Sequence, residues 1–260
     1  KQPEETSLFN RVRADFYSDK SGPHPKMGDF GEGTPEQKWR RLRAQYYSNV
    51  TLVDRAVGRI LNALNESGKA DETIVVFTSD HGEMAGDHGL LEKRAFYEAS
   101  AKVPLLLHVP WKDGQPRVIP GNMSHIDLVP TLLELMGEQV PAHLQGVSRV
   151  PVLNETEDLL ENDVYVQWNG LGDRELQAPG ANLLGAIPRR SIVTSEVAED
   201  GSVKRWKLNL CAGDQNELFD LSSDPDEMIN LYNRDHYRDR VRIMAAKLRL
   251  WQHETGDSAP

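Results

Sequence analysis

A run of β-branched and aromatic residues, Thr73-Ile-Val-Val-Phe-Thr-Ser79, leads directly into Asp80-His81-Gly82. The run has no polar alternation, which is typical of a strand covered on both faces in a largely parallel sheet. Open α/β sheets bind ligands outside the carboxyl ends of their strands. We therefore predict that Asp80 and His81 stand at that edge of a sheet, where Gly82 lets the backbone turn away.

Asp80 and His81 are a candidate pair of metal ligands. A carboxylate oxygen and a neutral imidazole nitrogen suit Ca²⁺, Mn²⁺ or Zn²⁺ better than a thiolate-seeking metal. A divalent ion needs roughly four to seven donors, so further ligands must come from elsewhere in the chain, from another chain, or from substrate and water. On the Asp-His-Gly triplet alone, the alternative is that Asp80 caps the turn and His81 is a surface residue.

Longer segments around this pair resemble those of a known family. The string Ser79 to Gly82, with Gly86-Asp87-His88-Gly89, Lys93, Tyr97-Glu98 and Val103-Pro104, is similar to the central metal-and-substrate segment of the sulfatase family, within the alkaline phosphatase superfamily. Later segments resemble the same family in order: 125–133, 145–148 and 217–231. An Asp-His pair, where many sulfatases carry Asp-Asn, is similar to the branch with choline sulfatases and phosphonate monoester hydrolases.

The resemblance implies roles for four side chains. Asp80 and His81 would complete a divalent-metal site, with Ca²⁺ as the favoured ion and Mn²⁺ or Zn²⁺ as alternatives. Lys93 would bind an oxygen of the sulfate or phosphate group being transferred; the alternative is an ordinary solvated lysine. His88 would hydrogen-bond the substrate or leaving group, or instead pin its own loop by bonding backbone carbonyls.

The activity implied is metal-dependent hydrolysis of small sulfate esters. Two alternatives stay open: a phosphonate monoester or phosphodiester hydrolase on the same scaffold, and a non-catalytic remnant or binding module. Sulfatases carry their nucleophile in a Cys-x-Pro-Ser-Arg segment, or Ser in place of Cys, where the Cys is oxidised to formylglycine. These 260 residues contain no such segment. We therefore expect the C-terminal portion of a sulfatase, inactive alone, with the missing N-terminal half as a partner.

Composition narrows the class of partner that this chain can bind. The single cysteine, Cys211, excludes an internal disulfide framework, and its apolar flanks predict a small buried side chain rather than a nucleophile. A formal net charge of −10 argues against nucleic acid. The longest apolar run, Val103 to Trp111, falls short of the ~20 residues that a membrane-spanning helix needs. The compartment stays unassigned.

The expected fold class is α/β: the C-terminal part of a mainly parallel sheet with helices on both faces, plus a small antiparallel sheet and helix subdomain. Residues 1–33 read as an irregular lead-in. Thr34-Pro35-Glu36-Gln37 then predicts the start of a long helix that Gly68 ends. We expect an apolar stripe of this helix to lie against the sheet: Trp39, Leu42, Tyr46, Val50, Val53, Val57, Leu61 and Leu64.

A second buried strand is predicted over 104–109 and a helix over 126–136. Five acids within 154–163 predict a domain boundary, so that 1–155 is the C-terminal part of the catalytic α/β domain and 156–260 the small α+β subdomain. That subdomain should hold strands at 164–168, 191–194, 204–210 and 217–220, then an amphipathic helix whose apolar face is formed by Tyr237, Val241, Met244, Leu248 and Trp251. In the loop 169–186, Asn169 and Arg174, with the preceding Trp168, are candidates for shaping a substrate pocket, against the alternative of a mobile surface loop.

Overall fold

The computed structural model describes residues 5–19, 22–23, 30–112, 115–170 and 187–259. Contacts divide the chain into two units, one built mainly from residues 8–116 and one mainly from residues 117–260. The sequence predicted a boundary near residue 155, whereas the contacts group 117–155 with the C-terminal part. The reason is local pairing: Gly121 forms a bridge with Leu159, and Arg149 bonds the Asn162 side chain. The functional assignment of the two parts stays a prediction.

The first unit begins with a helix that the sequence did not predict. Helix α1 (Leu8–Tyr17) is followed by the short antiparallel strands β1 (Ser18–Asp19) and β2 (Gly22–Pro23). The expectation of an irregular lead-in is therefore wrong for these residues. Phe9, Arg13 and Tyr17 recur every four residues and form one buried face. An arginine at the centre of that face hides the amphipathic pattern from sequence reading.

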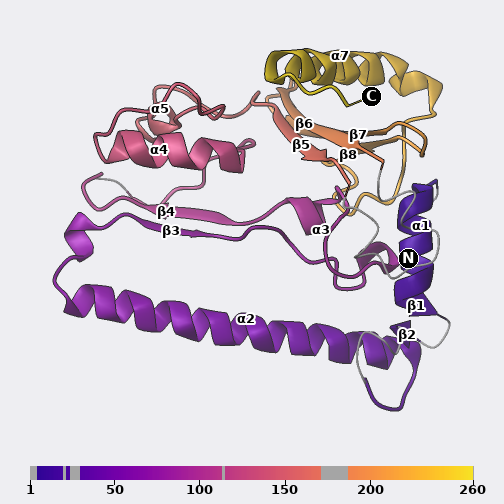
Figure 1. Ribbon diagram of the computed structural model, residues 1–260, viewed down its shortest axis with the longest axis horizontal. Coiled ribbons are helices and arrows are strands. Elements are labelled where there is room, and N and C mark those ends of the chain that lie inside the picture. The colour runs from indigo at the N-terminus through magenta and orange to yellow at the C-terminus, as the bar shows by residue number, and fades with distance from the viewer. Residues whose placement is uncertain (1–4, 20–21, 24–29, 113–114, 171–186, 260) are drawn as a thin grey trace. The chain divides into compact units, whose positions relative to one another are not determined.

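Helix α2 (Pro35–Glu66) confirms the predicted long helix (Figure 1). Thr34 caps it in the expected capping box with Gln37, and Pro35 occupies the first turn. The expected burial of its apolar stripe is wrong, because no residue of α2 is buried. Val53 is 56% exposed and Val50 is 48% exposed. Trp39, Leu42, Val57 and Leu64 are half-buried, so the described chain covers the stripe only in part.

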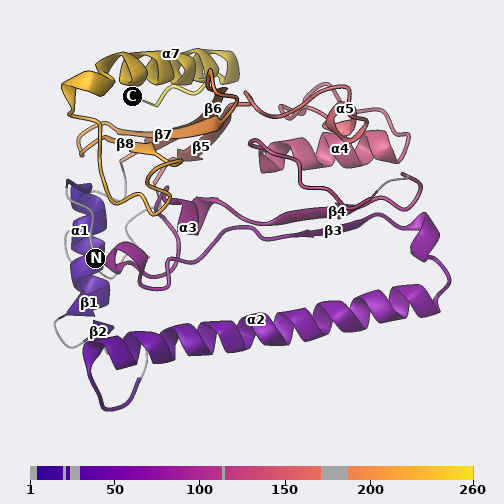
Figure 2. The same cartoon turned by 180° about the vertical axis from the view of Figure 1, so that it is seen from behind.

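After the one-turn helix η2 (Ala70–Glu72), strands β3 (Val75–Thr78) and β4 (Leu105–His108) run side by side in both views (Figures 1 and 2). They pair antiparallel, so the parallel pairing expected here is wrong. Only the one-turn helices η3 (Asp87–Gly89) and α3 (Glu98–Ala101) lie between them, instead of the long crossover helix that parallel strands need. Phe77 and Leu106 are 40% and 60% exposed, so these strands are not covered on both faces.

The second unit carries the predicted antiparallel sheet. Strands β5 (Val164–Trp168), β6 (Arg189–Val197), β7 (Val203–Cys211) and β8 (Glu217–Asp220) form it in chain order. After the one-turn helix η5 (Asp235–Tyr237), helix α7 (Arg238–Thr255) lies across one face (Figures 1 and 2).

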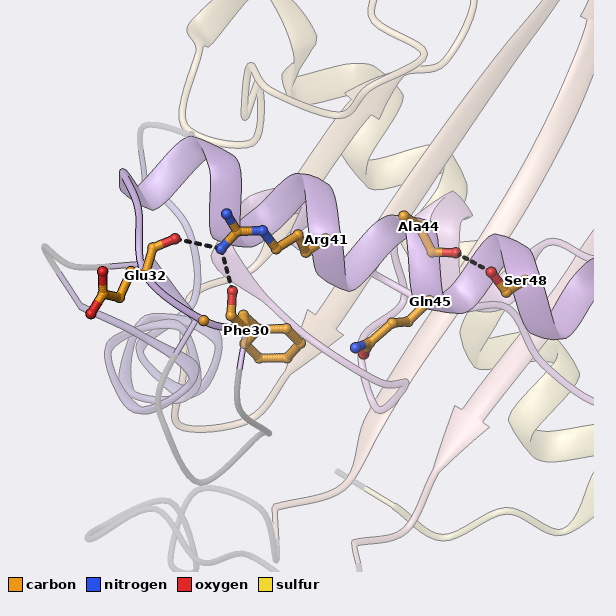
Figure 3. Close-up of a pocket in the computed structure, with 7 residues that line it drawn as sticks. Phe30, Glu32, Arg41, Ala44, Gln45 and Ser48 are labelled. Carbon is orange, nitrogen blue, oxygen red and sulfur yellow. Dashed lines mark hydrogen bonds between the residues drawn. The ribbon is translucent and has the colours of Figure 1, made fainter.

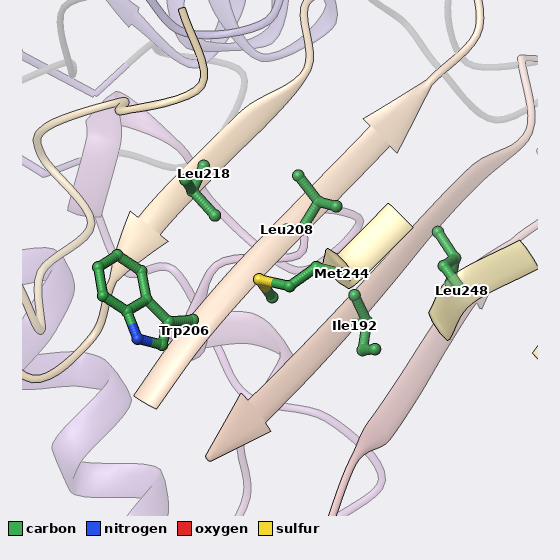
Figure 4. Packing of buried hydrophobic residues seen from close by; sticks show 6 residues of the cluster. All are labelled: Ile192, Trp206, Leu208, Leu218, Met244 and Leu248. Carbon is green, nitrogen blue, oxygen red and sulfur yellow. The ribbon is translucent and has the colours of Figure 1, made fainter. Parts of the chain in front are cut away.

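The core of this unit forms between the sheet and α7. Figure 4 shows its six fully packed side chains: Ile192, Trp206, Leu208, Leu218, Met244 and Leu248. Tyr237, Val241 and Trp251 pack around it, and Trp251 stacks on Tyr165 with ring centroids 4.9 Å apart. The helix face predicted from the sequence is therefore confirmed.

Helices η4 (His125–Asp127), α4 (Leu128–Leu135) and α5 (Val150–Leu153) complete the second unit. Asp127 is buried and accepts hydrogen bonds from the Val147 amide at 2.9 Å and from Arg149 Nε at 2.8 Å. This buried ion pair makes Asp127 a scaffold residue. Among the described helices, none is both long and apolar enough to cross a bilayer.

Candidate active site

Asp80 and His81 follow directly after β3, at the end of the strand where they were predicted. His81 Nε2 lies 3.5 Å from Asp80 Oδ2, so both side chains point to the same place. The Asp80 side chain is 84% exposed and the His81 side chain 39% exposed. The His81 amide also donates to Asp80 Oδ1 at 2.9 Å, and this bond holds the pKa of the Asp80 carboxyl below its usual value. The carboxylate is therefore ionised at neutral pH.

The His81 ring is held in the form that a metal ligand requires. Its Nδ1 lies 2.8 Å from the carbonyl oxygen of Gly82, which can only accept a hydrogen bond. Nδ1 therefore carries the proton in the neutral ring, and Nε2 keeps its lone pair. That nitrogen is the atom facing Asp80, so the donor set fits a divalent cation with one carboxylate and one imidazole.

Gly82 is required for a reason other than the predicted turn. A Cβ at this position would lie 2.1 Å from the carbonyl oxygen of Ala99, and the Gly82 amide donates to the Ser100 carbonyl at 2.8 Å. The backbone after the ligand pair therefore passes in direct contact with α3. The expected role in turning the backbone is replaced by this close approach.

The loop from Glu83 to Arg94 is strained and internally bonded. Four of the seven described non-glycine residues with positive φ lie in it: Ala85, His88, Glu92 and Arg94. Such residues cost free energy and persist only where the surroundings hold them, which they do most often at functional sites. Glu83 Oε1 accepts hydrogen bonds from the Ala85 amide at 3.0 Å and from the Glu92 amide at 2.6 Å.

His88 is buried inside this loop, with only 7% of its surface exposed. Its ring stacks on Tyr97, with ring centroids 3.9 Å apart and 7° between the planes. Tyr97 in turn accepts a hydrogen bond at its hydroxyl from Asn10 of α1, at 3.3 Å. The stacking holds the ring inside the loop, while the bonds to backbone carbonyls and the contact with substrate both stay predictions.

Lys93 lies between two residues of left-handed backbone, Glu92 (φ 61°) and Arg94 (φ 78°). It is partly buried. Its carbonyl oxygen accepts a 2.6 Å hydrogen bond from Nη2 of Arg13, a residue that the sequence analysis did not single out. The spacing of four residues from Phe9 and from Tyr17 is the sequence signal that could have placed Arg13 on the buried face of α1. The backbone of Lys93 is thus fixed, while its predicted role in binding an anion stays untested by this geometry.

The described residues supply only part of a metal site. Within the ranges that the structure covers, no group of three or more His, Cys, Asp and Glu side chains could hold a metal ion. Asp80 and His81 therefore need donors from other chain segments, substrate or water.

A hollow of about 590 Å³ lies elsewhere, at the start of α2 (Figure 3). Figure 3 shows Arg41 donating to the carbonyl oxygens of Phe30 and Glu32, so this guanidinium is already engaged by backbone. Gly31, Ala44, Gln45 and Ser48 complete the lining. None of the predicted site residues borders this hollow.

The remaining candidates from the sequence have structural partners or lie outside the described residues. The carbonyl oxygen of Trp168 and Oδ1 of Asn169 both accept hydrogen bonds from Arg190. Arg174 lies outside the described residues. Cys211 is buried, and burial raises the pKa of its thiol, which agrees with a small core side chain.

Comparisons with known proteins point to one family. The family model described as Sulfatase matches residues 12–138. An arylsulfatase of Clostridium perfringens is 29% identical over 246 residues, covering 87% of this chain and 47% of the relative. The chain therefore spans about half the length of this curated relative.

Two solved structures have similar folds. One was determined in complex with its substrate D-glucosamine-2-N,6-O-disulfate (TM-score 0.72, 26% identity, 90% of this chain and 45% of that one). The other is a phosphonate monoester hydrolase of Agrobacterium radiobacter (TM-score 0.69, 29% identity, 86% of this chain and 44% of that one). The α/β fold class is thereby confirmed, and residues 12–138 belong to a domain of the sulfatase family, within the alkaline phosphatase superfamily.

Proposed function

We propose that this chain supplies the metal- and anion-binding part of a metal-dependent hydrolase of sulfate esters. The observation that carries the proposal is the Asp80–His81 pair at the end of β3, with donor atoms 3.5 Å apart and Nε2 of His81 unprotonated in the neutral ring. The arylsulfatase relative and the structure with a sulfated sugar substrate support sulfate esters as the substrate class.

In this proposal Asp80 and His81 hold one divalent cation, with Ca²⁺ favoured and Mn²⁺ or Zn²⁺ as alternatives. When bound, the ion would neutralise charge on the group being transferred. The Lys93 ammonium binds an oxygen of the same group and stabilises the charge that develops on it. His88 shapes the loop that carries Lys93, or contacts the leaving group.

The nucleophile and the other metal ligands come from chain outside these 260 residues. Two observations support this part of the proposal. The chain covers only 44–47% of the length of the relatives described above. It also exposes an apolar face on α2, where Tyr46, Val53 and Leu61 are 40%, 56% and 37% exposed. An apolar helix face of this width needs a partner, and the nucleophile-bearing segment is the partner we propose.

The second candidate function is hydrolysis of phosphonate monoesters or phosphodiesters. It is favoured by the similarity to the phosphonate monoester hydrolase, which is at 29% identity in the aligned region. Sulfate and phosphonate groups present similar tetrahedral oxygens, so one cation and one lysine could serve either. The family alone therefore leaves this choice to experiment.

The test is a comparison of substrates at matched protein concentration. A longer protein that contains this chain and a nucleophile segment is assayed with an aryl sulfate, a phosphonate monoester and a phosphodiester. We expect kcat/KM to be highest for the aryl sulfate, and no turnover by the 260-residue chain alone, because the covalent step is absent. A higher kcat/KM for the phosphonate monoester would establish the second function. Failure with all three substrates would favour a non-catalytic role.

A further inference from the structure

Among the described residues of the first unit, the most deeply buried cation is Arg13, which is 1% exposed and lies on α1. Its guanidinium donates to three carbonyl oxygens of one short segment: Leu91 at 3.2 Å, Lys93 at 2.6 Å and Arg94 at 3.1 Å. The Arg13 side chain therefore forms hydrogen bonds with the backbone at Lys93 and on both sides of it.

The segment 91–94 has an unfavourable backbone conformation that other contacts must stabilise. Glu92 and Arg94 both have left-handed backbone, with φ of 61° and 78°. For residues other than glycine this conformation is unfavourable, so surrounding contacts must maintain it. Glu83 holds the Glu92 amide from one side, and Arg13 holds the carbonyls from the other.

Burying the charged Arg13 guanidinium away from water is unfavourable, so its contacts must offset the loss of hydration. Desolvation lowers the pKa of its guanidinium, and its aromatic neighbours are Phe9 and Tyr17, whose ring centroids lie 5.3 and 5.6 Å from Cζ. Carbonyl partners fix the path of a main chain in a way that a single carboxylate partner does not. The planar fork of arginine suits several acceptors at once, which a lysine ammonium cannot match in geometry.

We propose that Arg13 is the positioning residue for Lys93: its guanidinium holds the turn 91–94 and so fixes the backbone from which the lysine side chain extends. The inference rests on the proposed anion-binding role of Lys93. Arg13 itself touches no reacting atom in this account and acts only through the backbone of the loop.

The first arm of the test needs no activity. Amide hydrogen exchange is measured on the 260-residue chain for the parent, Arg13→Lys and the control Arg43→Lys. Arg43 donates to the Ala85 carbonyl at 2.9 Å, on the same loop but away from 91–94. We expect Arg13→Lys to speed exchange at Leu90 and Glu92 by about tenfold or more while the β6 and β7 amides are unchanged. Arg43→Lys should leave Leu90 and Glu92 unchanged. Equal exchange in parent and Arg13→Lys would overturn the inference.

The second arm is a double-mutant cycle in the longer, active protein. If Arg13 acts through Lys93, Arg13→Lys should lower kcat/KM by about tenfold, and should lower it no further once Lys93→Ala is present. Additive losses would overturn the inference while leaving Lys93 as an anion ligand. Full activity of Lys93→Ala alone would instead contradict the proposed function, so the two failures are distinguishable.

A third measurement applies if the arginine variants do not fold. In the parent chain, the amides of Leu90 and Glu92 should exchange together with those of α1, because one side chain ties the two segments. Rapid exchange of the loop amides while α1 stays protected would contradict the positioning role.

Discussion

Replacing Gly82 by alanine should displace the ligand pair from α3. A Cβ at this position would lie 2.1 Å from the Ala99 carbonyl oxygen, and real contacts of this kind essentially never fall below 3.0 Å. The two segments must therefore separate by about 0.9 Å, which also stretches the 2.8 Å hydrogen bond from the Gly82 amide to Ser100. Overpacking costs about 1–3 kcal/mol and a lost hydrogen bond about 1 kcal/mol, so we expect a loss of about 2–4 kcal/mol in the unfolding free energy.

Gly58→Ala is the matched control, because a Cβ at this position of α2 has no atom within 4 Å. Alanine is the better helix former, so this change should stabilise the chain by about 0.5–1 kcal/mol. Urea unfolding of both variants measures the free energies, and Mn²⁺ binding reports the site. Since ligands must be held to within about 0.5 Å, Gly82→Ala should also weaken binding about tenfold. Unchanged stability and binding in Gly82→Ala would refute the reasoning.

Three further outcomes follow from the site and from the second unit. In a longer protein that also carries the proposed nucleophile segment, Lys93→Ala should lower turnover about 10²-fold. The free energy of unfolding should stay within ~0.5 kcal/mol of the parent value, because Arg13 bonds the backbone carbonyl of residue 93 and not its side chain. Equal activity of the variant and the parent would remove Lys93 from the site. Glu227→Gln removes one charge of a fully buried pair with Lys207, whose charged atoms lie 2.9 Å apart, and should lower the free energy of unfolding by about 3–5 kcal/mol in urea. Glu196→Gln, at a half-exposed pair with Arg240, should lower it by about 1 kcal/mol or less. Equal losses in the two variants would contradict this difference between buried and exposed pairs. A hydrogen bond from Arg190 lowers the pKa of Asp257 from 3.8 to about 2, so this carboxylate stabilises the fold above pH ~4 and the stabilisation is lost as the pH falls through 2. The difference in Tm between the parent and Asp257→Asn should therefore shrink as the pH falls from about 4 to about 2. A constant difference in Tm over this range would contradict the role of Asp257.

The sequence correctly predicted the helices and strands that are determined by residues close to one another in the chain. The capping box at Thr34, the four strands of the second sheet and the buried face of α7 are of this kind. The end of β3 before Asp80 was also predicted. These features follow from hydrophobic period and cap chemistry, which neighbouring residues alone determine.

Features that depend on distant partners were predicted poorly. The apolar period of α2 gives the helix but cannot say what covers it, and here Val53 is more than half exposed. The run before Asp80 gives a strand but not its direction, which depends on the connection to β4. Helix α1 was missed because its buried face centres on Arg13, a charged residue whose partners are carbonyls about 80 residues away.

The same division holds within the candidate site. Asp80 and His81 are neighbours in sequence, so their proximity was predictable. The support of the loop by Glu83 and Arg13, and the stacking of His88 on Tyr97, depend on side-chain packing that spacing does not reveal. Backbone strain at Glu92 and Arg94 is likewise visible only in the structure.

Binding of Mn²⁺ to the 260-residue chain, followed by electron paramagnetic resonance of the free ion, tests the ligand pair most directly. We expect weak binding, with Kd on the order of 10⁻³ M, because the part of the chain that the structure describes brings only two protein donors together here. Asp80→Asn and His81→Ala should each weaken it about tenfold. Asp87→Asn, which removes an exposed carboxylate of the neighbouring loop that contacts Arg43, should leave it unchanged. Binding that is insensitive to Asp80→Asn, or as sensitive to Asp87→Asn, would contradict the metal site.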